Sequence, residues 1–134
     1  MASIIDIEGI GPVNAQKLKD AGVRSVAGLL KQGGTAKGRQ ELADATGIEP
    51  SKLLEWVNQA DLFRVRGIGS EYADLLEAAG VDTVPELRHR NANALYEKLV
   101  KTNAEKHIVR KLPTAGQVEM WVQQAKSLSR AIEY

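Results

Sequence analysis

Ile7-Glu8-Gly9-Ile10-Gly11 and Val65-Arg66-Gly67-Ile68-Gly69 are the two stretches that decide the fold of this 134-residue chain. Each places an aliphatic residue between two glycines, and each precedes the same order of small and aliphatic residues. That order reads Ala15, Leu18, Ala21, Gly22 and Val23 after the first stretch, and Ala73, Leu76, Ala79, Gly80 and Val81 after the second. Because so many positions recur in the same order, we interpret the chain as an internal duplication.

The duplication extends beyond the glycine stretches. The alignment pairs Ser25 with Thr83 and Leu29 with Leu87, and it places Trp56 and Trp121 near the ends of their copies. It predicts a first unit at residues 1–64 and a second unit at residues 65–134, which carries an insertion near residues 104–114. The join between the copies lacks Gly, Pro and Ser, so we expect the two units to pack together.

The local signals are helical in both copies. Pro12 suits the first turn of a helix, and Gly22 suits the left-handed residue that follows a helix end. Ser25 and Thr35 are typical helix caps, and Pro50 opens a longer helix with apolar residues at helical spacing. The predicted fold class is therefore all-α, with two tandem units of about five short helices each.

The second copy is expected to follow the same plan. Thr83 should cap a short helix, and either Asn91 or Asn93 should cap the next one. Asn103 stands roughly where the first copy has Gly47, and asparagine tolerates the left-handed conformation better than most residues. The last helix is predicted to begin near Thr114 and to run to about residue 132.

A glycine–aliphatic–glycine turn between two helices resembles the hairpin of the helix-hairpin-helix motif. Each unit is similar to the small N-terminal domain of archaeal and eukaryotic recombinases and, more loosely, to the C-terminal domain of the bacterial RNA polymerase α subunit. The chain as a whole resembles a bacterial family of uncharacterised proteins that carry tandem copies of this unit. That resemblance rests on residues 60–69, Tyr72, residues 75–76 and 79–84, and residues 86–91. It implies a fold more than a function, because one fold serves many functions.

The glycine stretches predict a phosphate-binding site. Glycines allow close approach to the main chain, and the following helix presents N–H groups and the positive end of its dipole. The candidate nucleic-acid-binding residues are Gly9, Ile10, Gly11, Val13, Asn14 and Lys17 in the first copy, and Gly67, Ile68, Gly69 and Ser70 in the second. The alternative is that each turn only packs one helix against another. The second copy favours this alternative, since Glu71, Asp74 and Glu77 would repel a phosphate.

A basic stretch in the second copy is a separate candidate anion or partner surface. Its members are Arg88, Arg90, Lys98, Lys101, Lys106, Arg110 and Lys111. The alternative is an ordinary solvated helix face. The run from Gly33 to Gly38 is no phosphate loop, because it lacks the GxxxxGK[ST] order and no strand precedes it. Trp56 and Trp121 are expected in the core, and Tyr72 is interpreted as a ring without an aromatic partner.

Composition narrows the function classes. There is no cysteine, which excludes thiolate metal sites. The net charge of +1 argues against a protein that coats nucleic acid tightly and nonspecifically. No residue set suggests a nucleophile with its base, so we expect no enzyme, no metal and no cofactor. No apolar run could span a bilayer, and a cytoplasmic location is expected.

We therefore expect a non-enzymatic helix-hairpin-helix module that contacts the DNA or RNA backbone weakly and without sequence specificity. The alternative partner is another protein, with the hairpins serving a structural role in an adaptor. The oligomeric state has no signature in the sequence.

Overall fold

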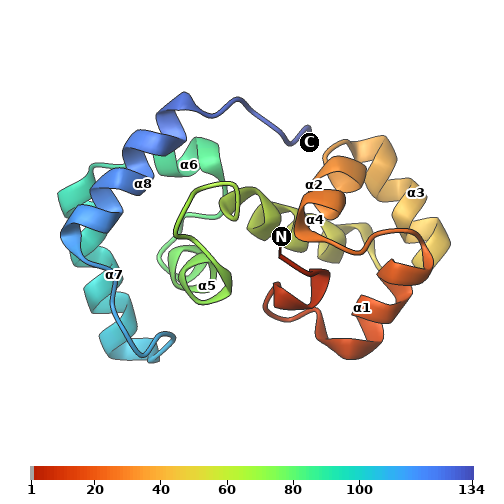
Figure 1. The fold of residues 1–134 in the computed structure, drawn as a ribbon, viewed down its shortest axis with the longest axis horizontal. Helices are drawn as coiled ribbons and strands as arrows, with labels where there is room; N and C mark the ends of the chain where they lie inside the picture. The colour runs from red at the N-terminus through yellow and green to blue at the C-terminus, as the bar shows by residue number, and fades with distance from the viewer. Residues whose placement is uncertain (1) are drawn as a thin grey trace. The chain divides into compact units, whose positions relative to one another are not determined.

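The computed structural model describes residues 2–134 and is all-α over that range, which confirms the predicted fold class (Figure 1). An isolated bridge pairs Ser3 with Ser25. None of the helices within these residues is both long enough and apolar enough to cross a bilayer. In chain order the elements are the 3₁₀-helix η1 (Ile4–Asp6) and the α-helices α1 (Gly11–Asp20), α2 (Val26–Gly33), α3 (Ala36–Thr46), α4 (Pro50–Leu62), α5 (Ser70–Ala78), α6 (Val84–Arg88), α7 (Ala92–Lys106) and α8 (Ala115–Ser127).

The chain divides into two compact units. The first comprises the residues up to Asp61 together with Ala131–Tyr134, and the second comprises Leu62–Arg130. The first unit holds η1 and four α-helices, and the second holds four α-helices within the described residues, against the expectation of about five short helices in each. The inclusion of the last four residues in the first unit has no counterpart in the sequence pattern.

Buried aliphatic residues form the core of the first unit. Ile4, Ile7, Leu18, Val23 and Leu29 are each no more than 1% exposed. Helix α1 carries Pro12 in its first turn and ends before Gly22, whose φ of +91° is the left-handed conformation expected there. The Val23 N–H then donates to the Leu18 carbonyl at 2.8 Å, which closes the turn.

The predicted caps of the first unit are present. The Ser25 and Thr35 side chains accept hydrogen bonds from the N–H groups of Gly28 and Gly38, at the starts of α2 and α3. Helix α3 ends at Gly47 with φ +76°, and α4 starts at Pro50 as expected. These local signals are therefore sufficient to place the boundaries of α2, α3 and α4.

The second unit has its own hydrophobic core, which runs from Leu62 in sequence to Ala125. Thr83 caps α6, and Asn91 rather than Asn93 caps α7. Thr114, near which the last helix was predicted to begin, caps α8 in a reciprocal arrangement with Gln117. Here too the turn after the first helix is closed by a bond from Val81 N–H to the Leu76 carbonyl, at 2.9 Å.

The end of α7 differs from the prediction. The helix continues to Lys106, and the left-handed residue is His107 (φ +51°) instead of Asn103. Asn103 stays helical because its side chain has other partners: its amide donates to the Val109 carbonyl at 3.1 Å and accepts from the Val109 N–H at 2.9 Å. The side chain thus replaces main-chain bonding for the segment that follows.

The end of α8 also differs from the prediction. The helix stops at Ser127, about a turn earlier than expected, and Leu128 is extended. Main-chain carbonyls beyond the helix find side-chain donors, since Arg88 donates to the Leu128 carbonyl at 3.0 Å and Arg64 to that of Ser129 at 2.7 Å. Ile132, which belongs to the first unit, is then buried at 3% exposure. These bonds and this burial outweigh continuation of the helix.

Candidate phosphate-binding hairpins and basic stretch

The first glycine hairpin, Glu8–Gly11, is a tight turn between η1 and α1. Gly9 and Gly11 have φ values of +88° and +71°, a region that favours glycine. Between them the side chain of Ile10 is 2% exposed, and its N–H donates to the Ile7 carbonyl at 3.4 Å. The aliphatic residue therefore anchors the turn in the core while Glu8 and Gly9 face solvent.

The start of α1 is open to a ligand. No side chain caps this helix, and Pro12 occupies its first turn. Val13 is 69% exposed, Lys17 is exposed and Asn14 is half-buried. A Cβ added at Gly11 would meet no heavy atom within 4 Å. The hairpin thus combines open space, helix N–H groups and one nearby cation.

The absence of a cap distinguishes the two helices that follow glycine hairpins. Among the α-helices whose N-terminal caps the structure describes, α1 and α5 begin without a side-chain cap. The other five begin with a side chain that accepts a main-chain N–H: Ser25, Thr35, Thr83, Asn91 and Thr114. The first N–H groups of α1 and α5 therefore have to find water or a ligand.

The second glycine hairpin, Arg66–Gly69, has a different local chemistry. Gly67 has a φ of +90°, but Gly69 has a φ of −111°, which other residues adopt without strain. Ile68 is 4% exposed and again anchors the turn. The Arg66 N–H donates to Gln124 Oε1 at 2.8 Å, and the exposed carboxylate of Glu71 lies in the first turn of α5. That carboxylate occupies the electrostatic position in which a phosphate would bind.

A buried tryptophan lies next to the first glycine of each hairpin. A Cβ on Gly9 would lie 4.0 Å from Trp56 Nε1, and a Cβ on Gly67 would lie 3.1 Å from Trp121 Nε1. Both tryptophans are at most 3% exposed, which confirms their expected place in the core. Tyr72, interpreted from the sequence as a ring without an aromatic partner, packs against Trp121 with a centroid distance of 5.3 Å. The sequence could not show this contact, because α5 and α8 are distant in the chain.

The first two residues of the basic stretch bind main-chain carbonyls. Arg88 is half-buried and donates to the Leu128 carbonyl, with its Nε also shielded from solvent. Arg90 donates to the Gly80 carbonyl at 3.1 Å and forms an ion pair with Glu86 at 3.6 Å. Both guanidinium groups therefore bond to carbonyls just beyond helix ends, Arg88 after α8 and Arg90 after α5.

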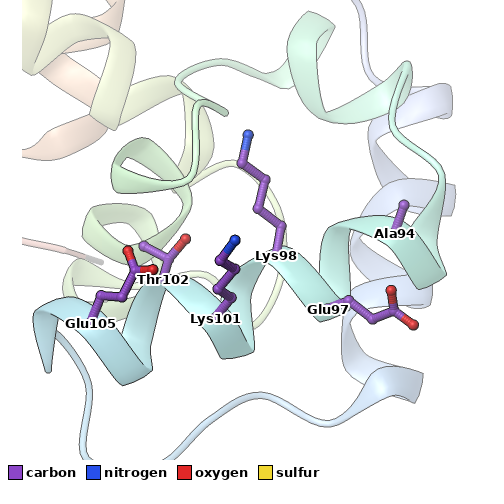
Figure 2. Close-up of a pocket in the computed structure, with 6 residues that line it drawn as sticks. All are labelled: Ala94, Glu97, Lys98, Lys101, Thr102 and Glu105. Atoms are coloured by element: carbon purple, nitrogen blue, oxygen red, sulfur yellow. The ribbon is translucent and has the colours of Figure 1, made fainter.

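The central residues of the basic stretch lie on one face of α7 (Figure 2). Lys98 and Lys101 border an open hollow of about 500 Å³ that is also lined by Glu97 and Glu105. The Lys98 ammonium lies 3.7 Å from where a Cβ of Gly80 would be, the site that Arg90 also approaches. Because two carboxylates accompany the two lysines, this face carries mixed charge.

The last three residues of the basic stretch, Lys106, Arg110 and Lys111, are exposed. The loop that carries Arg110 and Lys111 is held by the Tyr72 hydroxyl, which donates to the Lys111 carbonyl at 3.0 Å. The structure therefore separates the basic stretch into two structural arginines, a mixed face on α7 and a basic end beyond α7.

The buried position of Arg39 in the first unit was not predicted from the sequence. Arg39 is 6% exposed and donates to the carbonyls of Gly33 and Glu133, at 2.8 and 2.7 Å. Nothing in the pattern around Arg39 distinguishes it from the exposed cations of α2 and α3. The glycine run beside it is visible in the sequence. The Glu133 carbonyl that Arg39 binds, however, lies 94 residues further along the chain.

Comparison with known proteins gives a family but no activity. No solved structure matches this chain. The model of a domain of unknown function, DUF4332, matches residues 8–128, which include both glycine hairpins and both tryptophans. The chain therefore belongs to the DUF4332 family.

Proposed function

We propose that this protein is a non-enzymatic helix-hairpin-helix module that binds the phosphate backbone of nucleic acid weakly and without sequence specificity. The first glycine hairpin is the primary contact. In this proposal the two units are duplicates of one ancestral module, since the glycine hairpin, the supporting tryptophan and the closed turn recur at the aligned positions.

The observation that carries the proposal is the uncapped start of α1 beside an open glycine. Gly11 and Val13 lie in the first turn of α1, whose main-chain N–H groups are at the positive end of the helix dipole, and Asn14 follows them. The free space above Gly11 allows an oxygen ligand to approach the main chain. Lys17 follows on the same helix and supplies the charge that an anion requires.

The expected affinity is low. A net charge of +1 leaves few phosphates to neutralise, and Lys17 is the one exposed cation among the residues assigned to the first hairpin. Each neutralised phosphate contributes about −0.9 to the slope of log affinity against log salt concentration. We therefore expect a slope of about −1 to −2, far below that of a dedicated DNA-binding protein.

A titration of a fluorescent DNA duplex at low salt tests the proposal. Lys17→Glu should weaken binding and reduce the salt slope by about 1. Lys31→Glu, which reverses an exposed charge on α2, is the matched control and should retain the wild-type salt slope. No binding by the wild-type protein at tens of micromolar, or equal losses in both variants, would contradict the proposal.

The second hairpin has its own test. Gly69→Asp places a carboxylate in open space at an ordinary φ, so the variant should fold normally. If the first hairpin is the primary contact, Gly69→Asp should bind DNA nearly as well as wild type. A loss as large as that of Lys17→Glu would assign an equal part to the second hairpin.

The alternative is an adaptor protein in which the hairpins are structural. Two large apolar side chains favour it, since Val13 and Met120 are each 69% exposed. Affinity capture from native lysate with and without nuclease separates the two functions. A protein partner that survives nuclease treatment and high salt would support the adaptor, whereas recovery of nucleic acid alone would exclude it.

A further inference from the structure

The glycine run at the junction of α2 and α3 has a packing role. A Cβ on Gly33 would lie 2.6 Å from Val57 Cγ2, and a Cβ on Gly34 would lie 2.7 Å from the Leu30 carbonyl oxygen and 2.8 Å from that of Ala131. All three distances are shorter than real side chains allow. The missing side chain at Gly34 therefore makes room for the main chain of segment 131–134.

Arg39 donates a hydrogen bond to the main chain of that segment. Its Nη1 donates to the Gly33 carbonyl at 2.8 Å, and its Nη2 donates to the Glu133 carbonyl at 2.7 Å. Arg39 is 6% exposed, so departure of the segment would remove a hydrogen-bond acceptor from a buried residue that carries a charge. A buried donor of this kind favours an occupant that offers a carbonyl or carboxylate oxygen.

The same residue of the segment is bound on its N–H side. The Glu133 N–H donates to the Gly34 carbonyl at 2.6 Å. Gly34 and Arg39 thus bond both main-chain groups of residue 133, a form of recognition that does not depend on its side chain. We define the glycine corner as Gly33, Gly34 and Arg39.

A single side chain supplies the apolar anchor. Ile132 is 3% exposed, whereas Glu133 is exposed and Tyr134 is 63% exposed. The Tyr134 hydroxyl donates to Asn58 Oδ1 at 3.4 Å, a long bond at the margin of the site. The bound segment is non-helical (Figure 1). It carries a buried aliphatic residue, followed by a residue held through its main chain.

We propose that the glycine corner is a binding site for an extended peptide of a partner protein, and that segment 131–134 occupies it as a releasable ligand within the chain. The partner peptide carries an aliphatic residue at the position of Ile132. Short segments with one buried anchor open locally more readily than the core. A tethered segment has a high effective concentration, so an external peptide binds well only after the segment is displaced.

Full-length variants that release the segment test this proposal. Glu133→Pro removes the N–H that bonds to Gly34 and leaves the core of the first unit intact. Ile132→Asp removes the apolar anchor. Glu133→Ala keeps both main-chain groups and is the matched control. The probe is a fluorescent peptide with the sequence of residues 129–134, Ser-Arg-Ala-Ile-Glu-Tyr.

We expect both releasing variants to bind the peptide at least tenfold more tightly than wild type, with one peptide per chain. Glu133→Ala should match wild type, and a peptide with aspartate in place of isoleucine should not bind either variant. Amide exchange supplies the second readout: release should expose the residue 132 amide while α2, α3 and α4 remain protected.

If residue 132 becomes unprotected in a folded Glu133→Pro variant and the peptide still does not bind, the proposal is wrong. A concentration-dependent wild-type dimer that Glu133→Pro abolishes would assign the site to the segment of a second copy, and would overturn the assignment to a partner protein.

Discussion

Gly67 and Gly69 are separated by one residue, yet the structure requires glycine at only one of them. Gly67 has a φ of +90° and lies over the Trp121 indole, where a Cβ would come within 3.1 Å of Nε1. Gly69 has a φ of −111° and no heavy atom within 4 Å of a Cβ position. Neither a positive φ nor close packing requires glycine at position 69, which is the N-cap of α5, a position that favours glycine over alanine.

Gly67→Ala and Gly69→Ala should therefore have different effects on the free energy of unfolding. Gly67→Ala should lower the free energy of unfolding by roughly 1–2 kcal/mol, because a side chain at this φ is strained. Gly69→Ala should change the free energy of unfolding by less than about 1 kcal/mol, because restriction of the unfolded chain favours alanine whereas the N-cap position of α5 favours glycine. Urea unfolding followed by circular dichroism measures both. Equal losses would show that Gly69 is also a structural requirement.

Helix α7 shows how one side chain sets the end of an element. Asn103 bonds both main-chain groups of Val109, and His107 takes the left-handed position between them. These bonds allow α7 to extend to Lys106, past the point at which the first copy turns. The extra residues of the second copy are thus divided between a longer helix and the loop that follows it.

At the element scale, Asn103→Ala should destabilise this loop. It removes two hydrogen bonds, each with a net value of about 0.5–1.5 kcal/mol, so the loss should be about 1–3 kcal/mol. Amide exchange at Val109 should accelerate accordingly. Asn93→Ala changes an exposed residue near the start of the same helix and is the matched control. Slow exchange at Val109 in the Asn103 variant would refute this role.

At the scale of the whole molecule, the buried residues fall into separate cores. The large cluster of the second unit contains residues from Leu62 to Ala125. Leu18, which is 0% exposed, belongs to the first unit. The chain enters the second unit at Leu62 and returns to the first at Ala131, so the first unit is built from two distant parts of the sequence.

Leu18→Ala should therefore act mainly on the first unit. A cavity at a fully buried leucine costs about 2–5 kcal/mol. Hydrogen exchange followed by mass spectrometry should show faster exchange in α1–α4 and segment 131–134, with α5–α8 changed little. Leu99→Ala is the matched variant in the second unit and should give the reverse pattern. Uniform acceleration in both units would show a single cooperative structure.

Much of the fold was predictable because its signals are local. The caps at Ser25, Thr35, Thr83 and Thr114 depend on side chains that bond main-chain groups three residues away. The candidate hairpins were visible because glycine has few substitutes at positive φ. The roles of Arg39, Arg64 and Arg88 were not predictable, because each bonds to a carbonyl distant in sequence.

The all-α class, most helix boundaries and the positions of both glycine hairpins follow from the sequence alone, because helix propensity, capping and backbone conformation act over a few residues. The ends of α7 and α8, the burial of particular arginines and the place of segment 131–134 are visible only in the folded chain. Those outcomes depend on buried hydrogen bonds and apolar contacts between residues far apart in the chain, and such contacts leave no periodic trace in the sequence.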